Sequence, residues 1–459
     1  MWTFSRRRDV AAWSLVAALV AGASGQVRAQ GPAPPAQPDP VLEALVAEAL
    51  ANNPDVRTTE SAVAAAQAAI PGARALPNPM LSMTFTNDGW APSLGTMPMT
   101  TMGIMVSQGL PWPGKRGLRA DLATVQVRML EPAVERARLG IEAGVKRAYY
   151  GLLLARELEA IVTEQRRLWQ QIEIATRARY AAGQGVQPDV LRIQAEVTRI
   201  DQQAIEQAAE ADVRLAEINR LLARPLDTPV ETPAKLRLAP ITESFEEVAD
   251  AARGRSPELQ AARLAIEASE AAAALARREL RPDLTVQGGY MNRGGLDPMW
   301  QAGIGVSWPI DTRRRRSEIA EAEIAAKGGR HRSGSLELQL AYRTRERYTR
   351  AKAAERLVAL YDGGIVPQDQ MTVESALANY QTGNVPFASV LEAITALYAD
   401  RWARAGLVAE HARLVASLYE ASVDDASAMG PSGAPAAARI RTAASGSVAG
   451  GMSGGMSGR

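Results

Sequence analysis

Methionines are the residues of this 459-residue chain whose spacing most suggests chemistry. Six of the 14 lie within residues 80–105, namely Met80, Met83, Met97, Met99, Met102 and Met105. Thioether sulfur is a soft ligand that suits Cu(I), so the cluster is a candidate contact site for a metal cation. The alternative is that these methionines are apolar side chains that fill a lipid-facing surface or a loop. We favour it, because residue parity places Met80 and Met102 on one strand face and the others on the opposite face.

Residues for catalysis are scarce. The absence of cysteine excludes disulfides, thiolate metal sites and cysteine nucleophiles. Neither His331 nor His411 has partners at the spacing of a metal site or a catalytic triad. We therefore predict that the protein is not an enzyme and uses no cofactor. The net charge of +2 gives no reason to expect binding to nucleic acid.

Two pairs of short segments alternate between apolar and small or polar residues, which predicts β-strands. The clearest pair spans residues 283–291 and 299–309, and a weaker pair spans residues 79–88 and 99–110. Segments of about nine to eleven residues are long enough to cross a bilayer when tilted. Trp300 and Trp308 bound one apolar stripe, as in the aromatic girdle of a membrane barrel.

Prolines stand where these strands give way to helices, at Pro111, Pro113 and Pro309, with Trp112 among them. Proline donates no ladder hydrogen bond and fixes φ, which suits a change from strand to helix. A run of four arginines follows at residues 313–316. It binds lipid phosphate or is simply a solvated helix start, and the sequence leaves both interpretations open.

Long alanine-rich helical segments occupy residues 118–182 and 313–381, and shorter helices span 188–223 and 387–422. At 1.5 Å per residue, the first segment would extend roughly 100 Å, which no compact domain accommodates. Pro132 is expected to kink or split it, and Pro71 to end the helix that begins near residue 55. Gly363, Gly364 and Pro367 are expected to interrupt the second long segment.

The chain is a tandem duplication of about 200 residues. Ser256-Pro257 repeats Asn53-Pro54, and Tyr380-x-x-Gly383 repeats Tyr180-x-x-Gly183. We predict repeats at residues 41–225 and 241–422, separated by a linker at 226–240. Residues 1–29 read as a signal peptide, 30–40 as a proline-rich linker and 423–459 as a disordered tail.

Four strands per chain are too few for a membrane barrel, because an open strand edge is not tolerated in lipid. Several copies must therefore pool their strands; three would supply twelve and two only eight. The predicted fold is mainly α with a small β part, in which long antiparallel helical hairpins join four transmembrane strands. The alternative is a soluble periplasmic coiled-coil adaptor or scaffold, which the tryptophan-edged strands disfavour.

This arrangement resembles the TolC-type outer-membrane efflux proteins, and the methionine-rich stretch resembles their heavy-metal branch. The matching residues are the two Tyr-x-x-Gly tips, the Val-Leu pairs at 190–191 and 390–391, and the proline-tryptophan strand ends. The resemblance implies a homotrimer in outer-membrane lipid, with a twelve-stranded barrel and a long periplasmic helical tunnel. It also implies a periplasmic adaptor (a membrane fusion protein) and an inner-membrane pump of the RND type as partners.

The resemblance further implies roles for individual residues. The helix tips expected to dock the adaptor carry Tyr180, Gly183, Gly185, Tyr380, Gly383 and Asn384. Glu392 matches an acidic residue that rings the narrow periplasmic end in this family. Ser389 stands where this family often carries another acidic residue, and Asp189 occupies the place equivalent to Ser389 in the first repeat. Our hypothesis is that Asp189 and Glu392 line this gate and favour cations. The alternative for Asp189 is a cap on the helix that starts near Pro188.

Overall fold

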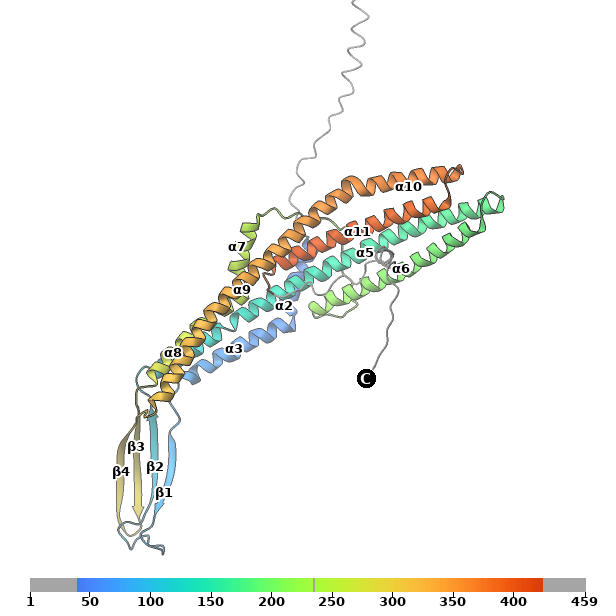
Figure 1. The fold of residues 1–459 in the computed structure, drawn as a ribbon. Coiled ribbons are helices and arrows are strands. Elements are labelled where there is room, and N and C mark those ends of the chain that lie inside the picture. Colours follow the sequence, from blue (N-terminus) through green and yellow to red (C-terminus); the bar gives the residue numbers. More distant parts are fainter. Residues whose placement is uncertain (1–38, 234–235, 424–459) are drawn as a thin grey trace, which may run out of the picture.

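The computed structural model describes residues 39–233 and 236–423. It shows a long helical body with a four-stranded sheet at one end and two helical hairpin tips at the other (Figure 1). The predicted signal peptide and nearly all of the predicted tail lie outside the described residues. Within the described part of the chain, no helix is both long and apolar enough to cross a membrane.

The two repeats contain corresponding elements in the same order, but the long helix is divided between α4 and α5 in the first and at the π-helix η1 in the second. The first comprises α2 (Pro40–Asn52), α3 (Pro54–Arg74), β1 (Met80–Thr86), β2 (Thr101–Leu110), α4 (Lys115–Arg128), α5 (Glu131–Ala181) and α6 (Gln187–Leu221). The second comprises α7 (Phe245–Arg255), α8 (Pro257–Arg278), β3 (Asp283–Arg293), β4 (Leu296–Ser307), α9 (Thr312–Leu360), the π-helix η1 (Tyr361–Ile365), α10 (Val366–Gln381) and α11 (Phe387–Tyr419).

The repeated X-Pro motifs have the same structural role. Asn53 ends α2 and caps α3, because its side chain accepts a hydrogen bond from the Asp55 amide at 2.9 Å. Ser256 likewise ends α7 and caps α8. A side-chain acceptor followed by proline satisfies the first turn of the new helix and prevents the old one from continuing.

The predicted helix breaks have three different outcomes. Pro132 is the second residue of α5, and the long segment is split just before it, as expected. The expectation for Pro71 was wrong: α3 continues through it to Arg74, because a single lost hydrogen bond in the last turns does not end a helix. Gly363 and Gly364 form a π-helix rather than a break, in which the Val366 amide donates to the Tyr361 carbonyl.

The sheet is antiparallel throughout, with the strand order β1-β2-β3-β4. Its four strands lie where the alternating segments predicted them, but β4 ends at Ser307, so that Trp308 and Pro309 belong to the connection before α9. Strands β1 and β4 have one unpaired edge each within the chain. The sheet is thus an open fragment.

Most buried side chains in the helical body gather in two clusters between α5 and its neighbours, and a smaller cluster joins α7, α9 and α11. One cluster joins α2, α5, α6 and α11, and includes Tyr149, Leu152 and Ile218. Another lies nearer the tips between α5, α6, α10 and α11, and includes Trp169 and Phe387. These clusters hold the two hairpins, α5–α6 and α10–α11, side by side in the part of the body that leads to the tips (Figure 1).

Candidate functional site

The sheet has one apolar face. Residues opposite each other in neighbouring strands point to the same side, so the register assigns every side chain to a face. The apolar face carries Leu81, Met83, Phe85, Met102, Ile104, Val106, Leu284, Val286, Tyr290, Trp300, Ile304 and Val306. Trp300 is 81% exposed and Ile304 76% exposed. A continuous exposed apolar surface of this kind requires an apolar partner.

The other face of the sheet is polar. It carries Ser82, Thr84, Thr101, Ser107, Thr285, Gln287, Gln301 and Ser307. Along β1, β2 and β3, residues of this face are mostly half-buried while those of the apolar face are mostly exposed. The sheet therefore curves around its polar face, which is the arrangement of a barrel wall with a polar interior.

The methionines are divided between the faces differently from the sequence prediction. Met80 and Met105 share the polar face, whereas Met83 and Met102 share the apolar face. The predicted assignment was wrong because β1 and β2 pair even-numbered with odd-numbered residues, which parity along the chain does not reveal. Met97 and Met99 precede β2 and belong to neither face.

A buried lysine joins the strands to the helices. Lys115, at the start of α4, is 1% exposed. Its Nζ lies 2.9 Å from Asp283 Oδ1 and 3.2 Å from Glu279 Oε2, and donates to the Arg281 carbonyl at 2.8 Å. Three anionic or polar oxygens compensate for the desolvation of the ammonium group. Sequence analysis missed this residue, because its partners lie more than 160 residues away.

The predicted junction residues surround this lysine. The Trp112 amide donates to Asp283 Oδ1 at 2.8 Å, and Arg278 donates to the Pro113 carbonyl at 2.7 Å. Burial acts to raise the pKa of Glu279, but hydrogen bonds from Arg119 and Lys115 lower it overall. The connection between β2 and α4, which contains Pro111, is thereby fixed to the connection between α8 and β3.

The second strand-helix connection of the chain is more open. Trp308 is 68% exposed, and Pro309 lies beside it without a comparable buried cation. The arginine run forms the first turn of α9, where Arg314 and Arg315 both contact Glu318. Arg313 and Arg316 are exposed and make no ion pair within the described residues.

The two helical tips have matching geometry. At the first, the Gly183 amide donates to the Tyr180 carbonyl and the Gln184 amide to the Arg179 carbonyl. At the second, Gly383 and Asn384 make the equivalent bonds to Tyr380 and Asn379. Gly183 has φ +74° and Gly383 φ +80°, which is the glycine-terminated helix end that the repeated motif predicts. Gly185 packs closely on the Tyr180 backbone, where a Cβ would lie 3.1 Å from its nitrogen.

A cation-aromatic contact links the tips. The Arg179 guanidinium at the end of α5 lies 4.6 Å from the centre of the Tyr380 ring and donates to the Tyr380 carbonyl. The Tyr380 ring packs edge-on against Phe387, which packs in the same way against Trp169. This series of contacts holds the end of α5 against the α10–α11 turn.

Both predicted gate residues lie at this end of the molecule. Asp189 is in the first turn of α6, but the residue that caps the helix is Val186, so the structure gives Asp189 no side-chain capping bond. Glu392 is exposed in the second turn of α11. Within the described residues, neither carboxylate forms an ion pair.

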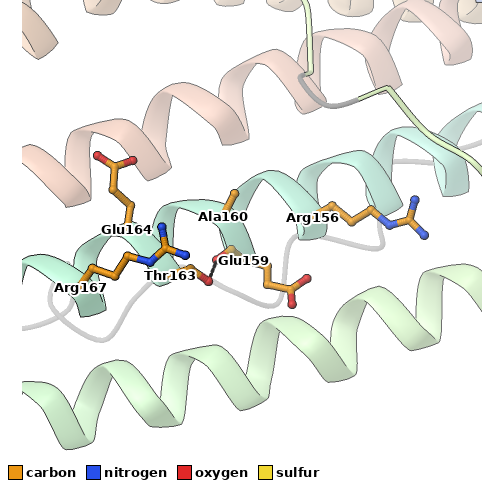
Figure 2. Close-up of a pocket in the computed structure, with 6 residues that line it drawn as sticks. All are labelled: Arg156, Glu159, Ala160, Thr163, Glu164 and Arg167. Carbon is orange, nitrogen blue, oxygen red and sulfur yellow. Dashed lines mark hydrogen bonds between the residues drawn. The ribbon is translucent and has the colours of Figure 1, made fainter.

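A shallow surface hollow of about 480 Å³ follows α5 (Figure 2). It is lined by Arg156, Glu159, Ala160, Thr163, Glu164 and Arg167. Glu164 binds Arg401 of α11 through both oxygens, at 2.7 and 2.8 Å, and this contact lowers the pKa of Glu164. Arg156 donates to the Val230 carbonyl at 3.1 Å. Arg156 and Glu164 are therefore engaged in contacts between elements of the helical body, and we assign them a structural role.

The buried histidine has a structural role. His411 on α11 is 1% exposed and lies 3.2 Å from Glu355 of α9. Lys352 also contacts Glu355, at 2.8 Å. Within residues 39–233 and 236–423, no group of three or more His, Cys, Asp and Glu side chains is arranged to hold a metal ion.

Comparisons with known proteins agree with this architecture. No curated protein gives a significant match. Among solved structures, the outer-membrane channel OprN is 19% identical with a TM-score of 0.71, covering 83% of this chain and 90% of its own. VceC of Vibrio cholerae is 18% identical with a TM-score of 0.70, covering 83% and 95%. The open state of MtrE from Neisseria gonorrhoeae is 18% identical with a TM-score of 0.68, covering 83% and 88%. At these identities the likeness concerns the fold.

The family assignment rests on a sequence profile. The profile of the outer membrane efflux proteins matches residues 45–224 and again residues 248–422. The two matches correspond to the two structural repeats and together span most of the chain. The chain therefore belongs to the outer membrane efflux protein family.

Proposed function

We propose that three copies of this chain form the outer-membrane duct of a tripartite efflux system. The observation that carries the proposal is the open four-stranded sheet, with an exposed apolar face and a concave polar face. Lipid contact accounts for the apolar face, and pairing of β1 with β4 of the next copy satisfies both free edges. The polar face then lines a barrel of twelve strands, a size that leaves an aqueous path.

The helical body continues this path into the periplasm. Helix α5 has 51 residues and α9 has 49, so each extends about 75 Å at 1.5 Å per residue. We assign the tip residues Tyr180, Gly183, Gly185, Tyr380, Gly383 and Asn384 to contact with a periplasmic adaptor, which connects the duct to an inner-membrane pump. The exposed turns at the tips support this, because they present backbone and small side chains to a partner.

We further propose that Asp189 and Glu392 ring the narrow end and favour cations as cargo, heavy-metal cations among them. Their unpaired carboxylates at the tips support this. Single-channel recording of Glu392→Ala in lipid bilayers tests the gate, with Glu374→Ala, which removes another exposed carboxylate on α10, as the control. The proposal predicts reduced cation selectivity for Glu392→Ala alone. Unchanged selectivity in both variants contradicts it.

Fractionation and mass measurement test the duct itself. The full chain, expressed with its leader, is expected in the outer-membrane fraction as a heat-modifiable trimer that conducts ions in planar bilayers. A soluble periplasmic monomer would contradict the proposal and support a coiled-coil scaffold instead. The exposed apolar face already disfavours such a scaffold, since a soluble protein would bury it.

A further inference from the structure

We propose that the polar face of the sheet carries a contact site for a soft monovalent cation, Cu(I) or Ag(I), made by Met105, Met291 and Met299. This inference rests on the proposed function, because the site meets the exported cargo only if the polar face of the sheet lines the duct. Two of these methionines, Met291 and Met299, lie outside the sequence cluster, and the strand register is what brings them to it.

The register places the three side chains on one face and in neighbouring positions. Met291 and Met299 are directly opposite each other in β3 and β4. Met105 pairs with Gly289, two residues from Met291 on the same face. Met80 lies on the same face, but it is on β1, three strands from Met299, and is not part of the site. Direct neighbours have Cβ atoms about 5 Å apart and diagonal ones about 7–8 Å, which the long methionine side chain spans.

Glycines beside the methionines leave room for them. A Cβ on Gly103 would lie 2.9 Å from Met291 Cγ, so the Met291 side chain lies over Gly103 of β2 on the polar face. A Cβ on Gly289 would lie 3.4 Å from Met105 Cβ, so the glycine places no side chain beside Met105 on this face. Met105 and Met291 are half-buried, and Met299 is 47% exposed, so the sulfur atoms line a surface that solvent reaches.

The donor set selects the class of cation. The three thioethers are soft, neutral donors, and their neighbours on this face are hydroxyl and amide groups such as Ser82, Thr84 and Gln301. Mg²⁺ prefers oxygen ligands and Zn²⁺ prefers imidazole, thiolate or carboxylate, whereas thioethers suit Cu(I) and the chemically similar Ag(I). Neutral donors also permit release, which a transport path requires.

Silver binding to the purified full-length protein tests the site. The protein carries ¹³C-methyl methionine and is titrated with silver nitrate in chloride-free buffer and detergent. We expect methyl signals of Met105, Met291 and Met299 to shift, while those of Met83 and Met102 on the apolar face stay fixed. The variant Met105→Leu/Met291→Leu/Met299→Leu is expected to lose roughly tenfold or more in affinity, because leucine matches the volume but offers no donor.

The matched control is Met83→Leu/Met102→Leu, which alters the opposite face of the same strands and is expected to retain wild-type affinity. Equal loss in both variants, no loss in either, or shifts confined to methionines elsewhere in the chain would overturn the proposal. Trimer mass and conductance are measured on the same samples. Failure of the duct appears as a lost trimer or pore, whereas failure of this site appears as absent silver binding by an intact trimer.

Discussion

The ammonium group of Lys115 lies 2.9 Å from the carboxylate of Asp283, across a sequence separation that spans the two repeats. This ion pair joins the connection between β2 and α4 to the start of β3. Glu279 completes the set of partners at 3.2 Å. The contact fixes the orientation of the strand pair relative to the helices, because both connections converge on one buried charge.

Lys115→Met should destabilise the protein by about 2–3 kcal/mol, since it leaves two carboxylates near each other without their cation. The measurement is the temperature at which the purified protein loses its helical circular dichroism. Arg313→Met is the control, because Arg313 is exposed and forms no ion pair within the described residues. A midpoint for Lys115→Met equal to that of the control would contradict the role assigned to the lysine.

Gly103→Ala should reduce folding of the sheet. A Cβ at this position would lie 2.8 Å from the Tyr290 carbonyl oxygen and 2.9 Å from Met291 Cγ, so β2 and β3 must separate. We expect a cost of about 1–3 kcal/mol, seen as a lower yield of heat-modifiable trimer. Gly305→Ala on the same face is the control, since its nearest neighbour is 3.7 Å away. Equal yields of the two variants would show that the strands tolerate the added methyl group.

Arg179→Met should loosen the tips. It removes the contact with the Tyr380 ring and the hydrogen bond to the Tyr380 carbonyl, and so frees α5 from the α10–α11 turn. We expect higher basal conductance in planar bilayers with unchanged trimer mass. Arg177→Met, which breaks only an ion pair to Glu173 on the same helix, is expected to conduct like the wild type. Wild-type conductance in both variants would show that the contact between Arg179 and Tyr380 does not keep the tips closed.

His411 should make stability depend on pH. Burial lowers its pKa, although the contact with Glu355 opposes the shift. The folded pKa is therefore below the ordinary value of about 6.5, and the unfolded chain binds the proton first as the pH falls. The thermal midpoint should hold above about pH 7 and decrease as the pH falls through 6.5 toward the folded pKa.

His411→Gln tests this assignment, because glutamine retains a hydrogen-bond donor for Glu355 but does not titrate. We expect its thermal midpoint to change less than that of the wild type between pH 7 and 5. His331→Gln, at an exposed position of α9, should retain the wild-type dependence. If the thermal midpoint changes equally with pH in the wild type and in both variants, titratable groups other than His411 cause the pH effect.

The local elements of this fold are determined by the sequence. Asn53-Pro54 and Ser256-Pro257 place helix boundaries, and Gly183 and Gly383 place the tips, because capping and left-handed turns depend on a few neighbouring residues. The alternation along residues 283–309 predicts its strands for the same reason. The same local signals occur in the same order in both halves of the chain, and this repeated order reveals the duplication and the family resemblance.

The tertiary structure alone decided which distant residues meet. Register set the faces on which Met80, Met105, Met291 and Met299 lie, and parity along the chain assigned some of them wrongly. The burial of Lys115 and the contact of Arg179 with Tyr380 likewise depend on partners more than 160 residues away. Such contacts depend on how complete hairpins pack on one another, and a pattern of a few neighbouring residues does not predict that packing.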